Sequence, residues 1–524
     1  MSDRLDGAAA RPHRLGERRL ATGVLLGLVI AAVLLRLVPV IFEPSLNWGD
    51  EIFQAMEPAH RLVYGYGLVA WEFQLGMRSW LLPGMIAGLM ELSRVAGDGP
   101  AYYLPAVAIG FGLLASAPVV CCFLWCYRWF GLAGAAVAGL AVTLAPELVY
   151  FGARTSSEVV AAHLLVVAFY LTEPGYKVTS RRRFVAAGIL FGLVCLLRIQ
   201  IAPAVAVVAL WPARHDWRSR LPALAGGFLA ALAFGATLDW LTLGYPLASI
   251  WRNFYYNLYL GISSDFDINP WYYYLLGELG IWLSAAPLVA VLAVLGARRL
   301  PILATAALVV VAVHSAIGHK EYRFIYPAIV PLMILAAIGL GELASWGEER
   351  LRQHGWRGSL ARATGIILPS AVWVAIAASV WSGGVIAPLR QRDRDELLAM
   401  TFVRQLPSLC GIAIDWSEAW VWAGGYSHLH RRIPMYWPTE AGASLPDASA
   451  FNVLIYRSVP PKQSGFDKLR CFGAVCVAQR PGPCEARAMP AMWFPPQLRA
   501  IAPAAERFEA LPPRSPPDRV RSQP

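Results

Sequence analysis

Apolar runs long enough to cross a membrane recur along the first three quarters of the chain. The hydrocarbon core of a bilayer requires about 20 apolar residues per helix, because it holds no water to hydrogen-bond an open backbone. Eleven runs, several of them short, are candidate spans: 21–42, 103–126, 132–151, 159–171, 184–197, 199–211, 221–241, 275–297, 300–318, 324–343 and 363–381. The pattern predicts an all-α polytopic membrane protein with about eleven transmembrane helices.

The apolar run at 80–90 is ambiguous. It is short and is interrupted by Pro83, Gly84 and Gly88. If it crossed the membrane, the basic cluster at 177–183 would lie outside, whereas a re-entrant or interfacial segment keeps that cluster inside. Because Lys and Arg concentrate in cytoplasmic loops, the second topology is favoured.

The first run, 21–42, follows Arg11, Arg14, Arg18 and Arg19. It is too long for the core of a signal peptide, and no small-residue cleavage site follows it. A retained anchor with a cytoplasmic N-terminus is therefore expected. In this orientation most Lys and Arg residues of the membrane-proximal segments lie inside, and the chain beyond 382 lies outside.

The C-terminal part has the pattern of a separate unit. Charge density rises after 382, and 411–415 and 451–457 resemble buried strands. Half of the eight cysteines lie here: Cys410, Cys471, Cys476 and Cys484. In an oxidising outer compartment they would form up to two disulfides, with three possible pairings. We expect a transmembrane domain at 1–381, a small extracytoplasmic α/β domain at 382–494 and a disordered tail at 495–524.

Composition narrows the class of protein. Only 15% of the residues are charged while 57% are apolar, and the mean hydropathy is +0.49. An ordinary soluble domain carries about 25% charged residues. These figures exclude a cytosolic enzyme, a nucleic-acid binder and a disordered scaffold. The net charge of +11 is then a matter of membrane orientation, and no nucleic-acid partner is expected.

The first outer loop, 43–102, is the longest in the membrane unit. A helix would place four of its polar residues on one stripe: Asp50, Gln54, Glu57 and Arg61. His60 would lie on another face. Such a helix can rest on the membrane with its acids directed into a cleft. The plainer interpretations are a solvated helix face and an N-cap at the adjacent acids Asp50 and Glu51.

A second outer segment, 318–327, gathers charge between two spans. His319, Lys320, Glu321 and Arg323 fall within five positions at the membrane boundary. Other charged residues are expected at the outer ends of spans: Arg154, Glu158, Arg198 and Asp239. Basic residues at such places often only anchor a helix to head groups. A histidine and a glutamate beside two cations exceed what anchoring requires, and ionisable groups at this depth are candidate functional residues.

This combination of acids and cations suits one class of reaction. A carboxylate takes a proton from an acceptor hydroxyl, while Arg, Lys or His holds the phosphate that leaves a lipid-phosphate sugar donor. The sequence has no Walker A motif, no Rossmann glycine fingerprint and no HExxH zinc pair. Their absence argues against nucleotide-driven transport and against a nucleotide-sugar donor site.

Two segments also resemble a known family. HKEYRFIYP at 319–327 resembles the HKEERF-type signature of the Alg9-like mannosyltransferases, glycosyltransferase family 22, which has the GT-C membrane fold. The loop DEIFQAMEPAHRLVYGYGLVAWE, with Arg78 and Ser79 after it, resembles that family's first outer loop, nearest to the branch that adds the third mannose of GPI anchors. Further matches follow in the expected order: Arg154-Thr155 with Glu158, Asp239 with Tyr245, NPWYYYL from Asn269 and GGYSHLHRRIPMY from Gly424.

The resemblance implies an inverting transferase that uses a polyprenyl- or dolichyl-phosphate mannose and makes an α-mannoside outside the cytosol. It implies no metal or other cofactor. Its partners would be the bilayer, the lipid-phosphate donor and a glycan or glycolipid acceptor. Carried over by position, the catalytic base is Asp50, with Glu51 beside it. The residues expected to bind the donor are Arg78, Arg154, Arg198, His319, Lys320, Glu321 and Arg323. Those expected to support them are Glu57, His60, Glu158 and Asp239.

Two departures from the family pattern stand out. Tyr322 replaces a second acid after HKE, and Arg198-Ile199-Gln200 replaces an Arg-Pro-Thr pattern. The Arg/Ala-rich composition resembles that of a bacterial homologue in an inner or plasma membrane, which would use a bacterial polyprenol. The competing hypothesis is a transporter or flippase for a lipid-linked glycan, although no internal repeat is present. Three tryptophans are candidates for acceptor contact, although an aromatic core has the same pattern: Trp416, Trp420 and Trp422.

Overall fold

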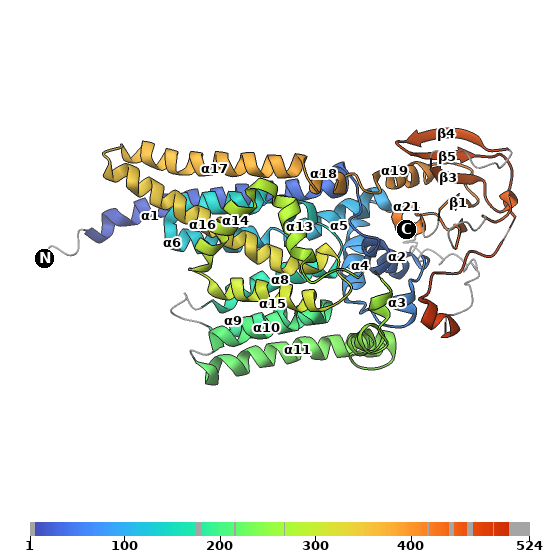
Figure 1. The fold of residues 1–524 in the computed structure, drawn as a ribbon, viewed down its shortest axis with the longest axis horizontal. Helices are drawn as coiled ribbons and strands as arrows, with labels where there is room; N and C mark the ends of the chain where they lie inside the picture. The colour runs from blue at the N-terminus through green and yellow to red at the C-terminus, as the bar shows by residue number, and fades with distance from the viewer. Residues whose placement is uncertain are drawn as a thin grey trace, which may run out of the picture.

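The computed structural model describes residues 6–173, 180–213, 216–266, 268–416, 419–439, 445–457, 465–485 and 487–501. The molecule is elongated, with a bundle of helices at the N-terminal end and a small sheet at the other end (Figure 1). Most of the long helices run along the long axis of the molecule. The bundle therefore has the form expected of a membrane-spanning unit that carries a unit on one side.

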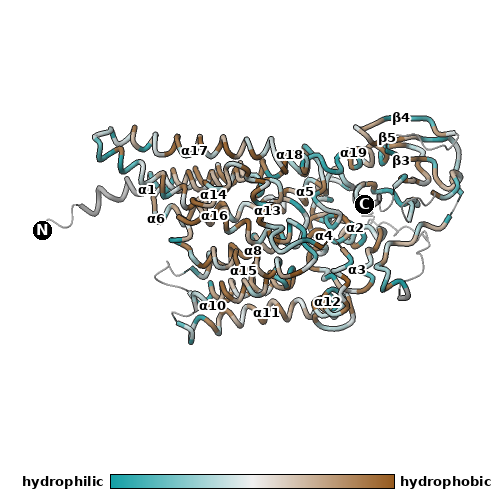
Figure 2. Tube along the Cα trace, viewed as in Figure 1, coloured by the Kyte–Doolittle hydropathy of each residue, from teal (hydrophilic) through white to brown (hydrophobic). Residues whose placement is uncertain are grey.

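The bundle is built from fourteen of the described helices. They are α1 (Asp6–Leu37), α4 (Leu81–Ser93), α5 (Pro100–Leu114), α6 (Ala117–Leu144), α7 (Pro146–Phe151), α8 (Ser157–Thr172), α9 (Arg181–Leu197), α10 (Ala202–Ala213), α11 (Trp217–Leu243), α13 (Tyr273–Trp282), α14 (Ala286–Ala297), α15 (Pro301–Ala316), α16 (Tyr326–Gln353) and α17 (Gly358–Ser382). Apolar residues cover most of their length (Figure 2).

Six helical segments in the described part of the chain are long and apolar enough to cross a bilayer: Gly16–Phe42, Pro100–Leu144, Trp217–Leu243, Tyr273–Ala297, Tyr322–Gln353 and Gly358–Ser382. Four shorter apolar helices accompany them: Leu81–Ser93, Ser157–Thr172, Ile199–Pro212 and Pro301–Ala316. The all-α polytopic fold is thus confirmed, and the number of about eleven spans stays a prediction. The ambiguous run at 80–90 forms α4, whose 13 residues extend only about 20 Å.

Helix α16 forms the centre of the bundle. Its most apolar window is 89% buried, and it packs against α6 and α14. Glycine allows the close approach to α14, because a Cβ on Gly339 would lie only 2.1 Å from the carbonyl oxygen of Leu292. Small residues commonly let membrane helices pack this closely. The signature segment 319–327, which leads into α16, is therefore joined to the most buried of the six candidate spans.

The outer segments between these helices form short elements. They are a π-helical turn at Glu51–Met56, α2 (Glu57–Tyr64), α3 (Trp71–Gln74), α12 (Ala248–Phe254), a π-helical turn at Tyr255–Tyr259, and 3-10 turns at Ile262–Asp265 and Tyr322–Ile325. They lie between the bundle and the C-terminal unit (Figure 1).

The C-terminal unit contains a five-stranded sheet in the order β2-β1-β3-β5-β4. Its elements are α18 (Ile386–Leu389), α19 (Arg394–Val403), β1 (Ile412–Ile414), α20 (Ala419–Trp422), α21 (Gly425–Leu429), β2 (Met435–Tyr436), β3 (Val453–Arg457), β4 (Asp467–Phe472) and β5 (Val475–Gln479). β1 pairs in parallel with β2 and β3, while β5 pairs antiparallel with β3 and β4. Both strands predicted from the sequence are present, as β1 and β3.

The structure also pairs the four cysteines of this unit. Cys410 bonds to Cys484 and Cys471 bonds to Cys476, one of the three possible pairings. The other four cysteines are free and buried in the bundle. The predicted boundaries of the domains stay predictions; past 495 the structure describes a 3-10 turn, Pro496–Ile501, in which Leu498 is buried.

Candidate active site

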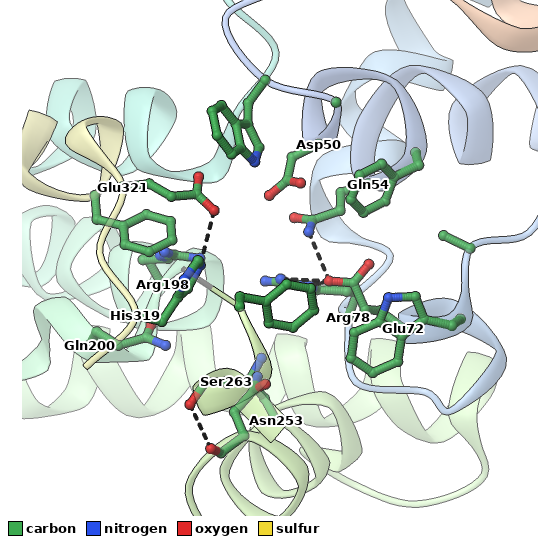
Figure 3. A pocket seen from close by; sticks show the side chains of 18 of the residues that line it. Asp50, Gln54, Glu72, Arg78, Arg198, Gln200, Asn253, Ser263, His319 and Glu321 are labelled. Atoms are coloured by element: carbon green, nitrogen blue, oxygen red, sulfur yellow. Dashed lines mark hydrogen bonds and ion pairs between the residues drawn. The ribbon is translucent and has the colours of Figure 1, made fainter. Parts of the chain in front are cut away.

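A cavity of about 840 Å³ lies where the bundle, the outer segments and the C-terminal unit meet. Its wall combines charged, amide and aromatic side chains (Figure 3). The polar and titratable residues that line it are Asp50, Gln54, Glu72, Arg78, Arg198, Gln200, Asn253, Asn257, Ser263, Asp265, His314, His319, Glu321 and Arg323. Six of the residues predicted from the sequence are therefore brought together: Asp50, Arg78, Arg198, His319, Glu321 and Arg323.

The first outer loop presents Asp50 and Gln54 to this cavity. Residues 51–56 form a π-helical turn and residues 57–64 continue as the α-helix α2. The wider π turn rotates the following residues relative to a regular α-helix. The stripe predicted from α-helical spacing therefore divides, with Asp50 and Gln54 at the cavity and Glu57 and Arg61 outside its lining.

Asp50 forms an ion pair with the guanidinium of Arg323. The same guanidinium holds two further carboxylates, Glu321 at 2.6 Å and Glu158 at 3.4 Å. Arg323 is thus surrounded by three acids and is only 5% exposed. A guanidinium so fully engaged orients Asp50 and Glu321, which lie on facing sides of the cavity (Figure 3), rather than offering its charge to a phosphate.

Burial has a strong effect on Asp50. Loss of solvation raises the pKa of Asp50 to about 7, although the nearby Arg323 favours its ionised form. A carboxylate in a low-dielectric site holds its charge less easily than in water. General bases act best when their pKa lies near the working pH. Asp50 therefore has both the position and the proton affinity of a general base.

Two arginines and a histidine lie below Asp50 in the cavity (Figure 3). Arg78 binds Glu72 through Nη2, at 2.9 Å, and through Nε; no described residue hydrogen-bonds its Nη1. Arg198 binds Glu158 at 2.9 Å, while its buried Nε has no partner among the described residues. His319 Nε2 lies 3.0 Å from Glu321.

Several predicted residues lie outside the cavity lining. Glu51 pairs with Arg154 at 3.2 Å and accepts the backbone N–H of Asn47 at 2.7 Å. Lys320 donates to the carbonyl oxygen of Asn269 at 2.8 Å. Asp239 accepts from the backbone and hydroxyl of Ser249 at 2.9 and 2.6 Å. These groups fix loops and helix ends around the cavity.

Glu57 and His60 join the first outer loop to the C-terminal unit. The carboxylate of Glu57 is fully buried and accepts the backbone N–H groups of Leu68, at 2.8 Å, and Ser427, at 2.9 Å. His60 Nε2 lies 3.1 Å from Nδ1 of His430. Glu57 and His60 thus hold the C-terminal unit against the loop that carries Asp50.

Replacement of Glu57 by glutamine tests this connection. The amide can accept only one of the two backbone N–H groups, so the other is left buried without an acceptor, at a cost of about 1–3 kcal/mol. We expect a lower midpoint of thermal unfolding for the protein in detergent. Glu91→Gln is the control, because Glu91 pairs with Arg94 on the exposed surface. An unchanged midpoint for Glu57→Gln would show that Glu57 does not hold the C-terminal unit against the first outer loop.

Sequence reasoning did not assign roles to Glu72, Asn253 and Trp493, all of which line the cavity. Glu72 holds both Arg78 and Gln54, whose amide nitrogen lies 2.8 Å from its carboxylate. Glu72 is part of the first-loop motif, which could have identified it as a site residue. Asn253 and Trp493 belong to segments with no recognisable pattern. Tyr322 turns away from the cavity and donates to Glu147.

The fold matches that of a solved membrane protein. Over 87% of this chain and 98% of the other, the structure superposes on ArnT from Cupriavidus metallidurans bound to undecaprenyl phosphate, with a TM-score of 0.57 and 14% sequence identity. The arrangement of helices is the GT-C architecture predicted from the sequence.

The sequence model of the Alg9-like mannosyltransferase family matches residues 27–393. This match and the fold together define an integral-membrane glycosyltransferase. The chain belongs to the Alg9-like mannosyltransferase family. It is 30% identical over 398 residues to GPI mannosyltransferase 3 of Yarrowia lipolytica, covering 74% of this chain and 72% of that one. It is 25% identical over 344 residues to GPI alpha-1,2-mannosyltransferase 3 of Danio rerio, covering 63% of this chain and 62% of that one. The chain thus spans somewhat less than two thirds of the length of the second relative.

Proposed function

We propose that the protein transfers a mannosyl residue from a polyprenyl-phosphate donor to a hydroxyl group of a lipid-linked or glycan acceptor, with inversion at the anomeric carbon. The observation that carries the proposal is the shared cavity, in which the Asp50 carboxylate and the side chains of Arg78, Arg198 and His319 face the same space. Two facts support it: the relatives are named mannosyltransferases, and a protein of the same fold binds undecaprenyl phosphate.

The proposed reaction uses Asp50 as the general base. Its carboxylate takes the proton of the acceptor hydroxyl while that oxygen attacks the anomeric carbon. The bond from this carbon to the phosphate oxygen breaks, and its electron pair leaves with the polyprenyl phosphate. Arg78, Arg198 and His319 offset the charge that develops on the phosphate, because charge-assisted hydrogen bonds are strongest where negative charge grows.

The cavity faces the extracytoplasmic side in this proposal. The starts of α1 and α9, the latter with Arg181, Arg182 and Arg183, stand at one end of the membrane unit (Figure 1). The concentration of Lys and Arg in the sequence around these helix starts assigns that end to the cytoplasm. The cavity and the C-terminal unit lie at the other end (Figure 1). Disulfides in that unit suit an oxidising compartment.

Transfer can be measured with purified protein in liposomes. Radiolabelled polyprenyl-phosphate mannose is supplied together with lipid extract from cells that lack the protein, and labelled products are separated by chromatography. The proposal expects a labelled acceptor that forms only with active protein. If labelled lipid crossed the membrane without any transfer, the protein would instead be a transporter.

The rate of transfer is expected to rise with pH through about 7. Asp50 acts only when ionised, and burial raises its pKa to about 7, so below that value the rate should rise about tenfold per pH unit. Measurement of kcat/KM from pH 5.5 to 9 tests this. In Asp50→Glu the base is kept but displaced, so the midpoint should shift. The same profile in both proteins would assign the titration to another group.

A further inference from the structure

The turn that carries Asp50 lies directly against the C-terminal unit. A Cβ on Gly49 would lie 2.3 Å from a methyl carbon of Val421 in α20, so position 49 has no room for a side chain. Gly49, Asp50 and Val421 all line the cavity. The wall of the cavity next to Asp50 is therefore built in part by α20.

Two tryptophans form a corner at this place. The rings of Trp48 and Trp422 are 6.3 Å apart and nearly perpendicular, at 83°. Both rings line the cavity and are only half-buried. The guanidinium of Arg392 lies 4.7 Å from the ring of Trp48 and 5.4 Å from that of Trp422. Arg392 also donates to the carbonyl oxygen of Asn47 at 3.1 Å, so the corner is held in place from behind.

The cavity thus has two chemically different regions. Arg78, Arg198 and His319 lie below the Asp50 carboxylate (Figure 3), where they suit a phosphate. Trp48 lies two residues before Asp50 in the chain, and Trp422 extends the same wall from the C-terminal unit. Inversion requires the acceptor to approach the anomeric carbon from the side opposite the leaving phosphate. The aromatic corner belongs to the wall next to Asp50 that these three side chains do not form, which suits it to the acceptor.

We propose that Trp422, with Trp48, forms the subsite that binds a sugar ring of the acceptor, a role that rests on the proposed transferase function. A pyranose has an apolar face of C–H groups and a rim of hydroxyls. An indole offers a large, flat apolar surface with little conformational freedom to lose. With its face against Trp422, the sugar presents its rim to Asp50, which takes the proton, and to Gln54, which lies on the same turn.

Trp416 provides a matched control. It belongs to the same C-terminal unit, is half-buried, and has the guanidinium of Arg457 at 4.5 Å from its ring. It does not line the cavity. The side chain of Trp420 lies outside the described residues. The variant Trp416→Ala therefore measures how the loss of a tryptophan from this unit affects the protein when the cavity wall stays intact.

Binding and transfer are measured separately with methyl α-D-mannopyranoside as the acceptor probe. Saturation-transfer NMR on protein in nanodiscs measures binding without donor, and transfer kinetics with polyprenyl-phosphate mannose give the KM for each substrate. We expect Trp422→Ala to weaken probe binding and raise the acceptor KM about tenfold, the loss typical of one aromatic contact, with less than a twofold change in donor KM. Trp422→Phe should recover part of the loss, and Trp416→Ala should match the wild type.

The outcomes separate the subsite from the transferase function. Equal probe binding by Trp422→Ala and the wild type, or equal losses in Trp422→Ala and Trp416→Ala, would overturn the subsite. No binding of the probe to the wild type would also overturn it. Probe binding that depends on Trp422, with no transfer by the wild type, would uphold the sugar subsite and reject the proposed reaction.

Discussion

Replacement of Asp50 by asparagine is expected to lower the rate of transfer about a thousandfold, within the range that a general base contributes. The amide has the same shape as the carboxylate and still accepts a hydrogen bond from Arg323, but it cannot take up a proton. The adjacent Glu51 cannot replace it, because its carboxylate is held by Arg154 and by the N–H of Asn47. The measurement is kcat with saturating donor and acceptor.

Asp98→Asn is the matched control for this experiment. Asp98 is an acid of the same outer loop whose carboxylate accepts a hydrogen bond from Tyr64 at the surface. It does not line the cavity. We expect this variant to retain wild-type transfer. If Asp50→Asn kept more than a tenth of the wild-type rate while correctly folded, Asp50 would not be the base.

Loss of the Arg78 side chain is expected to reduce kcat/KM for the donor about a hundredfold. A guanidinium forms strong charge-assisted hydrogen bonds with a phosphate, and such bonds are worth more in a site that excludes water. Arg78 is held by Glu72 through Nε and Nη2, which leaves Nη1 for the donor. Arg78→Lys should recover part of the loss, since a lysine keeps the charge but not the planar geometry.

A second variant separates donor binding from folding. Arg78→Ala leaves the buried carboxylate of Glu72 without its cation, and an uncompensated buried charge is destabilising. The double variant Arg78→Ala/Glu72→Gln removes that charge. We expect it to regain thermal stability without regaining use of the donor. Recovery of both would show that Arg78 serves only to neutralise Glu72. Arg94→Ala is the control, because Arg94 pairs with Glu91 at the surface.

The geometry changes the role expected for Arg323. Its place in the signature segment indicates a phosphate-binding cation, yet the structure surrounds it with Asp50, Glu321 and Glu158. With three acids on one guanidinium, little positive charge is left for a phosphate. We therefore propose that Arg323 positions Asp50 and Glu321, and that Arg78, Arg198 and His319 bind the donor.

Much of the fold was predictable because it follows from local properties of the chain. Apolar runs mark helices that a membrane can hold, and the strand patterns at 411–415 and 451–457 reappear as β1 and β3. The family followed from the segment 319–327 and the first outer loop, and the match over 27–393 confirms it. These features depend on neighbouring residues only, and so can be found in the sequence.

The set of residues that line the cavity was only partly predictable. Asp50 and Glu51 are adjacent acids, but backbone geometry directs Asp50 into the cavity and ties Glu51 to Arg154. The π-helical turn at 51–56 divides a stripe that α-helical spacing had joined. A π turn is wider than an α-helical turn, so it changes the direction of the side chains that follow it. The pattern of residue types does not show where such a turn occurs.

The sequence by itself determined that this is a helical membrane protein of one family, and which segments carry its chemistry. Only the tertiary structure decided which charges face each other. Trp416 and Trp422 lie close together in the chain, and the sequence does not distinguish their roles. In the structure, Trp422 lines the cavity and Trp416 does not. The physical reason is that spans, strands and motifs arise from contacts along the chain, whereas a site arises from contacts between residues as distant as Gly49 and Val421.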